Sequence, residues 1–225
     1  MLKLFSNPNH LTYKNHIAIL SLNTYMKPNS LIEEAQKGDK KAFNELVNQW
    51  YSRIYNFAFK YFAEHDQASE VAQKTFISVY KNLSKLKESN SFRPWIYQIA
   101  SNHCHDELRK KQKKWTISFF KSSESNESNL SELHEKSTDK GIDPEYQLGQ
   151  SELSELLQKA LKLISEEQRI VLILKEYEGL KFHEIAEALN ISENTAKSRL
   201  YYGLKHLKNI FEKWNIKQEN IYYEL

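Results

Sequence analysis

Apolar side chains recur every three or four positions in each long segment of this chain, and no segment alternates apolar and polar residues as a half-buried strand does. The first half of the chain contains three helical segments with such an apolar stripe. They lie in 39–62, in 67–83 and in a helix that begins near Ser91 and Pro94. The chain of 225 residues has 5 Gly and 4 Pro, which argues against a turn-rich β fold and against an enzyme built on glycine-rich phosphate loops. The sequence therefore predicts an all-α fold. The clearest stripe, in 39–62, consists of Phe43, Leu46, Val47, Trp50, Ile54, Phe57, Ala58 and Tyr61.

Charge divides the chain into parts. Lys and Arg outnumber Asp and Glu 16 to 10 in residues 28–121, are outnumbered 7 to 2 in residues 122–145, and nearly balance, 11 to 12, in residues 146–225. The middle part holds six Ser and few large apolar groups, so it cannot bury enough surface to offset its ordering entropy. We expect two small helical domains joined by a flexible acidic linker. The expected divisions are an N-terminal extension (1–27), a three- or four-helix bundle (28–115), the linker (116–145), a second helical domain (146–215) and a tail (216–225).

The first 27 residues lack the features of a targeting segment. No clear basic region precedes the short apolar stretch IAILSL, which argues against a signal peptide. No run approaches the ~18 apolar residues of a membrane span, and a single Cys excludes a disulfide within the monomer. The protein is therefore expected to be cytoplasmic. Met26 stands just before Ser30–Glu33, a capping-box sequence expected to open the first helix, so the sequence leaves open whether translation starts at Met1 or Met26 and residues 1–25 are expected to be dispensable.

The third helix is expected to end in a basic run beside a cluster of aromatic residues. Five of the six residues from Arg109 to Lys114 are cations. They are either a solvated helix end that suits the backbone dipole or residues that contact nucleic-acid phosphates. Aromatic side chains among cations are typical of surfaces that stack unpaired bases, and packing in the core is the alternative, expected for at least one of the three. These aromatic residues are Phe92, Trp95 and Tyr97, and the neighbouring cations are Lys81, Lys85, Lys87 and Arg93.

The second domain carries a helix-turn-helix pattern. An amphipathic helix over 148–163 is followed by Ser165, which caps a helix that is apolar on nearly all sides through 170–174, and Gly179 is a natural stop. A short helix over 182–189 then ends at Asn190, and Ser192 caps a longer, basic helix. Two helices joined by a three-residue turn, with a net charge of +3 on the second, are typical of proteins that insert a helix into the major groove. A purely structural helical hairpin is the alternative.

Two stretches resemble one family, the extracytoplasmic-function (ECF) sigma factors of bacterial RNA polymerase, in the sigma-70 superfamily. ISEEQRIVLILKEYEGLKFHEIAEALNISENTAKSRLYYGLKHL is similar to the family's region 4, and ASEVAQKTFISVYKNL with SFRPWIYQIASNHCHDELRKKQ is similar to its region 2. The resemblance covers about residues 30–115 and 146–212. It implies a subunit that binds core polymerase, through the β′ clamp and the β flap, and promoter DNA. It also implies an anti-sigma inhibitor as a further partner.

The resemblance also implies roles for individual residues. For the −35 element, bound by the second domain, these are Ser192, Asn194, Thr195, Lys197, Ser198, Arg199, Tyr201 and Tyr202. For binding and melting of the −10 element by the first domain, they are Lys81, Lys85, Arg93, Trp95, Asn102, Arg109, Lys110 and Lys111, with the 84–92 loop and Trp95 expected to capture a flipped base. For core polymerase they are Glu70, Gln73 and Lys74. Asn102, Asp106 and Arg109 match an Asn-x-x-x-Asp-x-x-Arg pattern of the family.

The chain departs from the family pattern at four positions. Lys74 and Ser69 replace acidic residues, which puts part of the clamp contact in doubt. Tyr202 replaces an Arg and cannot make the bidentate contact with guanine that Arg makes. Gly203 replaces an Ala and costs the helix roughly 1 kcal/mol, but it permits close approach of another backbone. The promoter element that this chain recognises is therefore expected to differ.

Other functions explain less of the sequence. A helix-turn-helix regulator that acts without polymerase accounts for the second domain but not for the aromatic and basic residues of the first. His103 and His105 suggest a metal site only superficially, because neighbouring positions on a helix point about 100° apart and no second cluster supplies further ligands. We expect no cofactor and no catalysis by this chain. The acidic linker is either a plain spacer or, through its charge of −5, a mimic of RNA in the polymerase exit channel.

Overall fold

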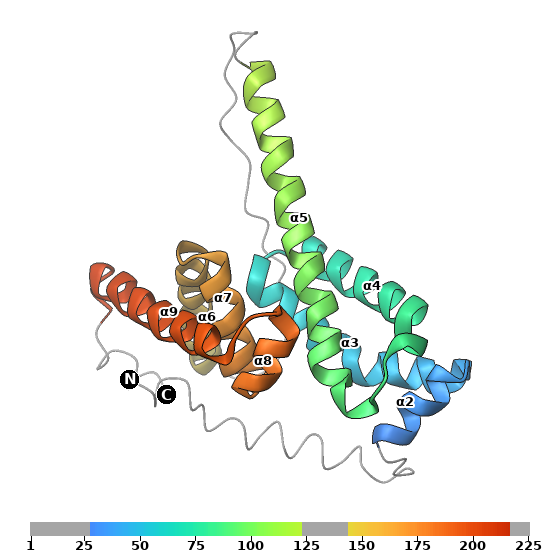
Figure 1. Ribbon diagram of the computed structural model, residues 1–225. Helices are drawn as coiled ribbons and strands as arrows, with labels where there is room; N and C mark the ends of the chain where they lie inside the picture. The colour runs from blue at the N-terminus through green and yellow to red at the C-terminus, as the bar shows by residue number, and fades with distance from the viewer. Residues whose placement is uncertain (1–27, 123–143, 217–225) are drawn as a thin grey trace.

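The computed structural model describes residues 28–122 and 144–216, with side chains for 30–113 and 154–216 (Figure 1). All regular structure in these ranges is helical, which confirms the predicted all-α fold. The first part contains α2 (Pro28–Gln36), α3 (Lys40–Phe62), α4 (His65–Asn82), two short 3-10 turns (Leu83–Lys85 and Ser89–Ser91) and α5 (Phe92–Ser122). The second contains α6 (Pro144–Leu163), α7 (Glu166–Leu172), a π-helical turn (Ile173–Tyr177), α8 (Phe182–Leu189) and α9 (Glu193–Lys213). The expectations for residues 1–25 and for most of the linker lie outside the described residues.

Short polar side chains cap the starts of α3 and α7. Asp39 accepts hydrogen bonds from the backbone N–H groups of Lys41 (2.7 Å) and Ala42 (3.2 Å) at the start of α3. Ser165 accepts from the N–H of Gln168 (3.3 Å) at the start of α7. Gly179 follows the π-helical turn with φ +65°, a conformation that glycine adopts without strain.

Several helix ends differ from the predictions, including α6, which begins at Pro144 and not at 148. The first helix begins at Pro28, so Ser30 lies inside it and does not cap it. Proline suits a first helical turn because its missing N–H would have had no partner there. The third helix does not end at the basic run but continues to Ser122. No Gly or Pro occurs from 95 to 122, so nothing in the local sequence stops it and the start of the expected linker is helical.

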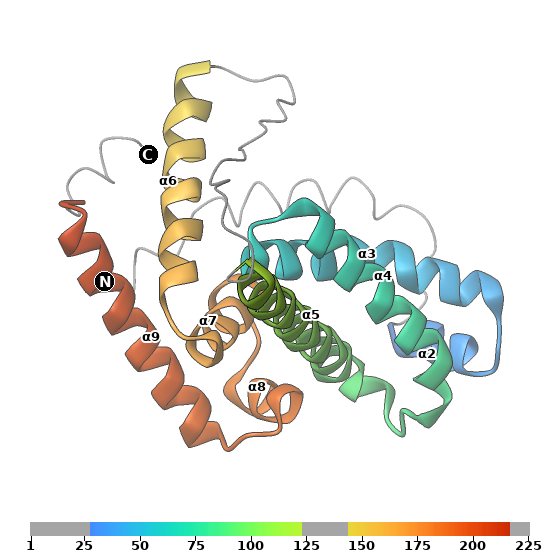
Figure 2. The ribbon, with the colours of Figure 1, turned by 90° about the horizontal axis from the view of Figure 1, so that it is seen from above.

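The two parts of the chain share one hydrophobic core. Figure 2 shows α5 between α3 and α4 on one side and α7 and α8 on the other. One continuous cluster of buried residues runs from Leu46 and Phe57 through Ala100 and Cys104 on α5 into the second part. There it includes Ile170, Val171, Ile173, Leu174, Leu180, Ile185, Ala188 and Ala196. The sequence predicted two domains joined by a linker but gave no sign that they pack together.

Several predicted core positions are confirmed, whereas Tyr80 and Leu163, both expected on apolar stripes, are exposed. Phe92 and Tyr97 are 2% and 1% exposed, so at least two of the three aromatic residues pack in the core. Cys104 is fully buried, as expected of a small apolar residue. Tyr80, expected on the apolar stripe of α4, is 63% exposed and contacts the edge of the Phe43 ring at 5.0 Å between centroids. None of the helices in the described residues is long and apolar enough to cross a membrane.

Candidate nucleic-acid interface

The turn between α8 and α9 has the geometry of a helix-turn-helix. Asn190 ends α8 in the left-handed conformation (φ 51°, ψ 50°), and the N–H of Ile191 reaches back to the carbonyl of Ala186 at 3.0 Å. Ser192 then accepts a hydrogen bond from the N–H of Thr195 at 3.0 Å and caps α9. These contacts all lie within a few residues, so the local sequence sets the angle between the two helices. The end of α8 at Asn190 and the cap at Ser192 were predicted.

The predicted −35 residues occupy the exposed side of α9. Its opposite side is held by the buried residues Ala196, Gly203 and Leu207. Gly203 lies so close to α7 that a Cβ atom there would sit 3.3 Å from Cβ of Gln168, which confirms the predicted close approach. Tyr201 and Tyr202 are 65% and 51% exposed. Ser192, Asn194, Lys197 and Ser198 are also exposed, whereas Thr195 and Arg199 are half-buried.

Two of the α4 residues assigned to polymerase, Glu70 and Lys74, belong to an ion-pair network that reaches α5 through Lys74. Lys74 bonds to the carboxylate of Glu70 one turn away and to that of Glu107 on α5 (2.5 Å). Glu107 also accepts from Lys110 at 2.8 Å. The hydrogen bonds to Glu107 and Glu70 raise the pKa of Lys74 above its usual range. Lys74, which departs from the family pattern, therefore connects α4, the helix assigned to polymerase, with α5, the helix assigned to the promoter.

Exposed apolar side chains lie on the same helix as this network. Ile77 is 54% exposed and, like Tyr80, follows Gln73 and Lys74 on α4. Neither was singled out from the sequence as a contact residue. Their exposure indicates a contact surface, because covering a large apolar side chain with a partner protein is favourable.

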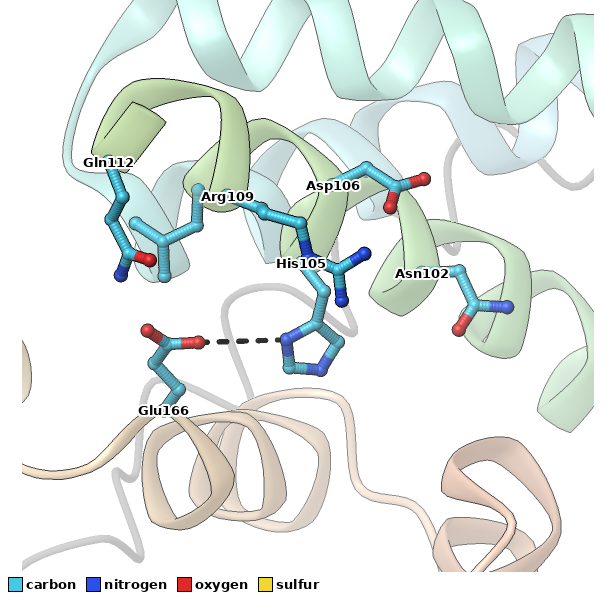
Figure 3. Close-up of a pocket in the computed structure, with 7 residues that line it drawn as sticks. Asn102, His105, Asp106, Arg109, Gln112 and Glu166 are labelled. Atoms are coloured by element: carbon cyan, nitrogen blue, oxygen red, sulfur yellow. Dashed lines mark ion pairs between the residues drawn. The ribbon is translucent and has the colours of Figure 1, made fainter. Parts of the chain in front are cut away.

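The predicted −10 residues do not form one cluster. Asn102 and Arg109 line an open pocket of about 570 Å³ with Asp106, His105 and Glu166 (Figure 3). Trp95 lies at the other end of α5, roughly 21 Å from Arg109 along the axis at ~1.5 Å per residue. It is half-buried, with its ring 6.0 Å from that of Phe92. The remaining lysines are exposed, with Lys85 bonded to Asn82 and Lys111 to Glu64.

The two histidines on α5 have different partners. His103 Nε2 lies 2.9 Å from the hydroxyl of Ser78 on α4, and burial lowers the pKa of its ring. His105 Nδ1 lies 3.7 Å from the carboxylate of Glu166 on α7 (Figure 3). Within the described residues, no three His, Cys, Asp or Glu side chains come together to hold a metal ion.

Arg93 and Tyr97, at the start of α5, contact the second part of the chain. Arg93 donates to the carbonyl of Glu178, and its guanidinium lies 3.6 Å from the carboxylate of Glu184. Tyr97 donates its hydroxyl proton to the side chain of Glu178 at 2.5 Å. Burial raises the pKa of the Glu178 carboxyl, although the hydrogen bond from Tyr97 opposes that shift. Arg93, which the sequence analysis assigned to DNA, therefore binds the second part of the chain in this structure.

Arg169 is a buried cation that the sequence analysis missed. It is 8% exposed and donates to four backbone carbonyls. Three belong to the end of α6, at Leu161 (2.7 Å), Lys162 (3.1 Å) and Ile164 (3.3 Å), and the fourth is Tyr61 on α3 (3.2 Å). Burial lowers the pKa of its guanidinium. The available signal was an arginine within a helix that is apolar on nearly all sides, because such a helix gives a charged side chain little access to water.

Comparison with known families identifies the class of protein. A model described as Sigma-70 region 2 matches residues 46–114, and one described as Sigma-70, region 4 matches residues 154–207, together more than half of the chain. The first match lies on α3 to α5 and the second on α6 to α9. The chain belongs to the sigma-70 family of RNA polymerase sigma factors.

Proteins similar to this chain include ECF sigma factors. The chain is 28% identical over 177 residues to the ECF RNA polymerase sigma factor SigW of Bacillus subtilis, covering 79% of this chain and 92% of that protein. It is 26% identical over 180 residues to an ECF RNA polymerase sigma-E factor of Haemophilus influenzae, covering 80% and 93%. The predicted resemblance to ECF sigma factors is confirmed.

Solved structures of similar fold include two that contain a bound partner protein. CnrH in complex with the cytosolic domain of CnrY has a TM-score of 0.60, with 18% identity over 83% of this chain and 97% of that one. RpoE of Bartonella quintana in complex with the anti-sigma factor NepR has a TM-score of 0.59, with 19% identity over 76% and 98%. The fold of this chain is therefore that of a two-region sigma factor.

Proposed function

We propose that this chain is the promoter-recognition subunit of an RNA polymerase holoenzyme in the cytoplasm, in which α9 binds the −35 element and the first module binds and melts the −10 element. Here the first module means residues 28–122 and the second module residues 144–216. The observation that carries the proposal is the capped helix-turn-helix, whose second helix exposes Asn194, Lys197 and Ser198 in its first two turns. Catalysis and cofactors belong to the polymerase.

Specificity at the −35 element would come from the first turns of α9. A helix of this kind enters the major groove with its N-terminal residues against base edges. Lys197 offers a charged donor, and Tyr202 offers one hydroxyl and a flat ring where the family has Arg. A single hydroxyl makes one hydrogen bond to a base, so we expect a weaker preference for guanine at the position that Tyr202 faces.

Polymerase binding would use the outer face of α4. Gln73, Ile77 and Tyr80 are exposed along it, beside the ion-paired Glu70. A polar and apolar mixture of this kind suits a protein partner, for which we propose the β′ clamp, with the second module on the β flap. The fold neighbours CnrH and RpoE were each solved with a bound partner, so we also propose an anti-sigma protein that binds this chain.

Run-off transcription tests this function. Purified core polymerase is incubated with genomic fragments from the source organism, with and without the chain, and the transcripts are mapped. We expect transcripts with defined 5′ ends only when the chain is present. Lys213→Ala, at the far end of α9, is a matched control for Lys197→Ala and should transcribe normally. Tight binding of the chain alone to a palindromic duplex, without any stimulation of polymerase, would instead support a regulator that acts without polymerase.

A further inference from the structure

Glu193 is an acidic side chain in the part of α9 that is assigned to the −35 element. It is the first residue of α9, directly after the Ser192 cap, and its side chain is 50% exposed. The sequence from 192 to 211 contains no other Asp or Glu, whereas it contains four Lys and Arg. An acid at a helix N-terminus favours folding through the backbone dipole. Beside DNA the same carboxylate is repelled by phosphates, so it weakens binding unless a base donates a hydrogen bond to it.

Lys197 lies next to Glu193 and has a second contact on α8. Its Nζ atom lies 3.8 Å from the Glu193 carboxylate, one turn away on α9. The same Nζ lies 5.7 Å from the centroid of the Phe182 ring at the start of α8. A cation at this distance is attracted to the face of an aromatic ring. The Lys197 side chain is still 52% exposed, so a hydrogen-bond donor and an acceptor lie side by side in the first turns of α9.

Stabilisation of the helix is the simpler explanation for this pair. Exposed Glu and Lys side chains four residues apart stabilise a helix slightly. A second pair of the same kind lies at the other end of α9, where Lys208 Nζ is 3.5 Å from the Glu212 carboxylate. Only the pair at 193 and 197 lies in the turns that face base edges when such a helix enters the major groove. The two pairs therefore provide a matched comparison within one helix.

The major-groove edge of a G·C base pair matches the donor and acceptor of the first pair. Guanine presents two adjacent acceptors, N7 and O6, and cytosine presents the N4 amino donor. Because O6 and N4 are hydrogen-bonded to each other, they lie about 3 Å apart, close to the 3.8 Å between Lys197 and Glu193. An A·T pair offers a lysine no two adjacent acceptors, and the thymine methyl group lies beside O4.

We propose that Glu193 determines sequence specificity by accepting a hydrogen bond from the N4 amino group of a cytosine in the −35 element, while Lys197 donates to the guanine of the same base pair. The inference rests on the proposed function, because it requires α9 to lie in the major groove. Phe182 is a positioning residue, since its ring attracts Lys197 from α8. A carboxylate only accepts and an ammonium only donates, so the two groups recognise the order of acceptor and donor along the base pair.

Selection from promoters with a randomised −35 element tests the role of Glu193. Holoenzymes containing the wild-type, Glu193→Ala or Glu193→Gln chain bind the library, and the bound DNA is sequenced. The wild type should select a G·C pair at one position, and Glu193→Ala should lower that discrimination about tenfold. Glu193→Gln should shift selection there toward A·T, because an amide binds adenine through two hydrogen bonds. Affinity for promoters without the G·C pair should not fall, whereas loss of helix stability would lower affinity for every sequence.

Two different failures can be told apart in this selection. If the proposed function is wrong, the wild-type holoenzyme selects no −35 sequence at all. If the role of Glu193 is wrong, the wild type selects a sequence and Glu193→Ala leaves the discrimination unchanged, or the wild type selects no G·C pair. Either of the last two results would overturn the proposal.

A double variant separates base recognition from helix stability. Lys197→Ala leaves Glu193 beside the phosphates without its cation, so it should weaken binding about tenfold or more. Adding Glu193→Ala should recover about threefold of that affinity by removing the repulsion, but none of the G·C preference. A double variant that binds no better than Lys197→Ala would contradict the proposal.

Glu212→Ala is the matched control, because it removes the equivalent ion pair at the other end of α9. It should leave selection unchanged at every −35 position, and circular dichroism shows whether the helices of each variant persist. Loss of the G·C preference in Glu212→Ala as well would attribute the effect to helix stability and overturn the proposal.

A modified base tests the individual hydrogen bond. N4-methylcytosine at the selected position keeps the base pair and removes the amino hydrogen that faces the major groove. Binding of the wild-type holoenzyme should fall about tenfold, and binding of the Glu193→Ala holoenzyme should hardly change. Equal losses for the two would show that Glu193 does not contact this group.

The positioning role of Phe182 is tested through its coupling to Lys197. Phe182→Leu should reduce the G·C preference about threefold in the chain that contains Lys197 and have no further effect on preference in the Lys197→Ala chain. Phe182→Tyr keeps the ring and should behave as the wild type. Equal effects of Phe182→Leu with and without Lys197 would limit Phe182 to packing.

Discussion

The two helices assigned to promoter DNA are organised in opposite ways. On α9 the candidate side chains lie on an outer face, with Tyr201 and Tyr202 more than half exposed. On α5, charged side chains in the first turn and beyond the middle of the helix have protein partners, Glu178 and Glu184 for Arg93, and Glu64 for Lys111. The exposed side chains assigned to the −35 element are open to solvent, whereas charged side chains assigned to the −10 element have protein partners.

The largest effect is expected at the residue that ties the modules. Arg169→Met removes a buried cation and leaves four carbonyls without their donor, so it should lower the free energy of unfolding by about 3–5 kcal/mol. Urea denaturation of the full chain measures this. Lys162→Met, on the exposed side of α6, should cost less than about 0.5 kcal/mol. Equal costs for the two would show that Arg169 does not hold the modules together.

Trp95→Ala tests whether the start of α5 serves packing or strand opening. Its ring packs against the shared core, so truncation should cost about 2–4 kcal/mol, less than for a fully buried tryptophan. If Trp95 also stacks a base, transcription from duplex promoters should fall and a premelted bubble should restore it. Permanganate footprinting beside a thermal melt separates these roles. Normal open-complex reactivity with a strongly lowered melting temperature would limit Trp95 to packing.

The contrast between the helices predicts two kinds of DNA-binding defect. Lys197→Ala on α9 should weaken the binding of the holoenzyme to promoter DNA by about 1–3 kcal/mol. It should also change the sequence preference at the −35 element. Lys110→Ala with Lys111→Ala should weaken binding at every sequence and reduce the log–log salt slope by about one per phosphate contact. Filter binding at several salt concentrations measures both. Identical losses that are independent of sequence would contradict the assignment of Lys197 to base contacts.

The smallest effect is expected at the network between α4 and α5. Lys74 is about one-third exposed, so its pair with Glu107 should contribute less than about 1 kcal/mol. A double-mutant cycle of Lys74→Met and Glu107→Gln measures the coupling in unfolding and in affinity for core polymerase. Lys74→Met alone should free Glu70 and raise that affinity slightly. A large loss of affinity would show instead that Lys74 itself contacts polymerase.

Local chemistry explains why much of the fold could be predicted. The caps at Asp39, Ser165 and Ser192 and the left-handed Asn190 each depend on residues within about four positions, so their sequence signals are complete. For the same reason the helix-turn-helix, and the residues that it exposes, were visible in the sequence.

Contacts over long sequence distances explain what could not be predicted. The partner of Arg169 on α3 lies 108 positions away, and that of Tyr97 lies 81 positions away. Hydrophobic periodicity carries no information about such pairs, so two modules could be predicted from the sequence but their interface could not. The predicted burial of Tyr80 was wrong for a related reason. Helical spacing alone does not show which edge of an apolar stripe a neighbouring helix covers.

The π-helical turn at Ile173–Tyr177 makes the interface depend on the length of one segment more than on its composition. An α-helix advances by about 100° per residue, and a π-helical turn contains one residue more than an α-helical turn of the same span. Deletion of a single residue there would rotate everything beyond it by that angle and move Glu178 away from Tyr97. Substitutions between similar apolar residues would keep the alignment. Insertions and deletions in this segment should therefore be far less tolerated than replacements, although the segment is neither a recognition helix nor a cap.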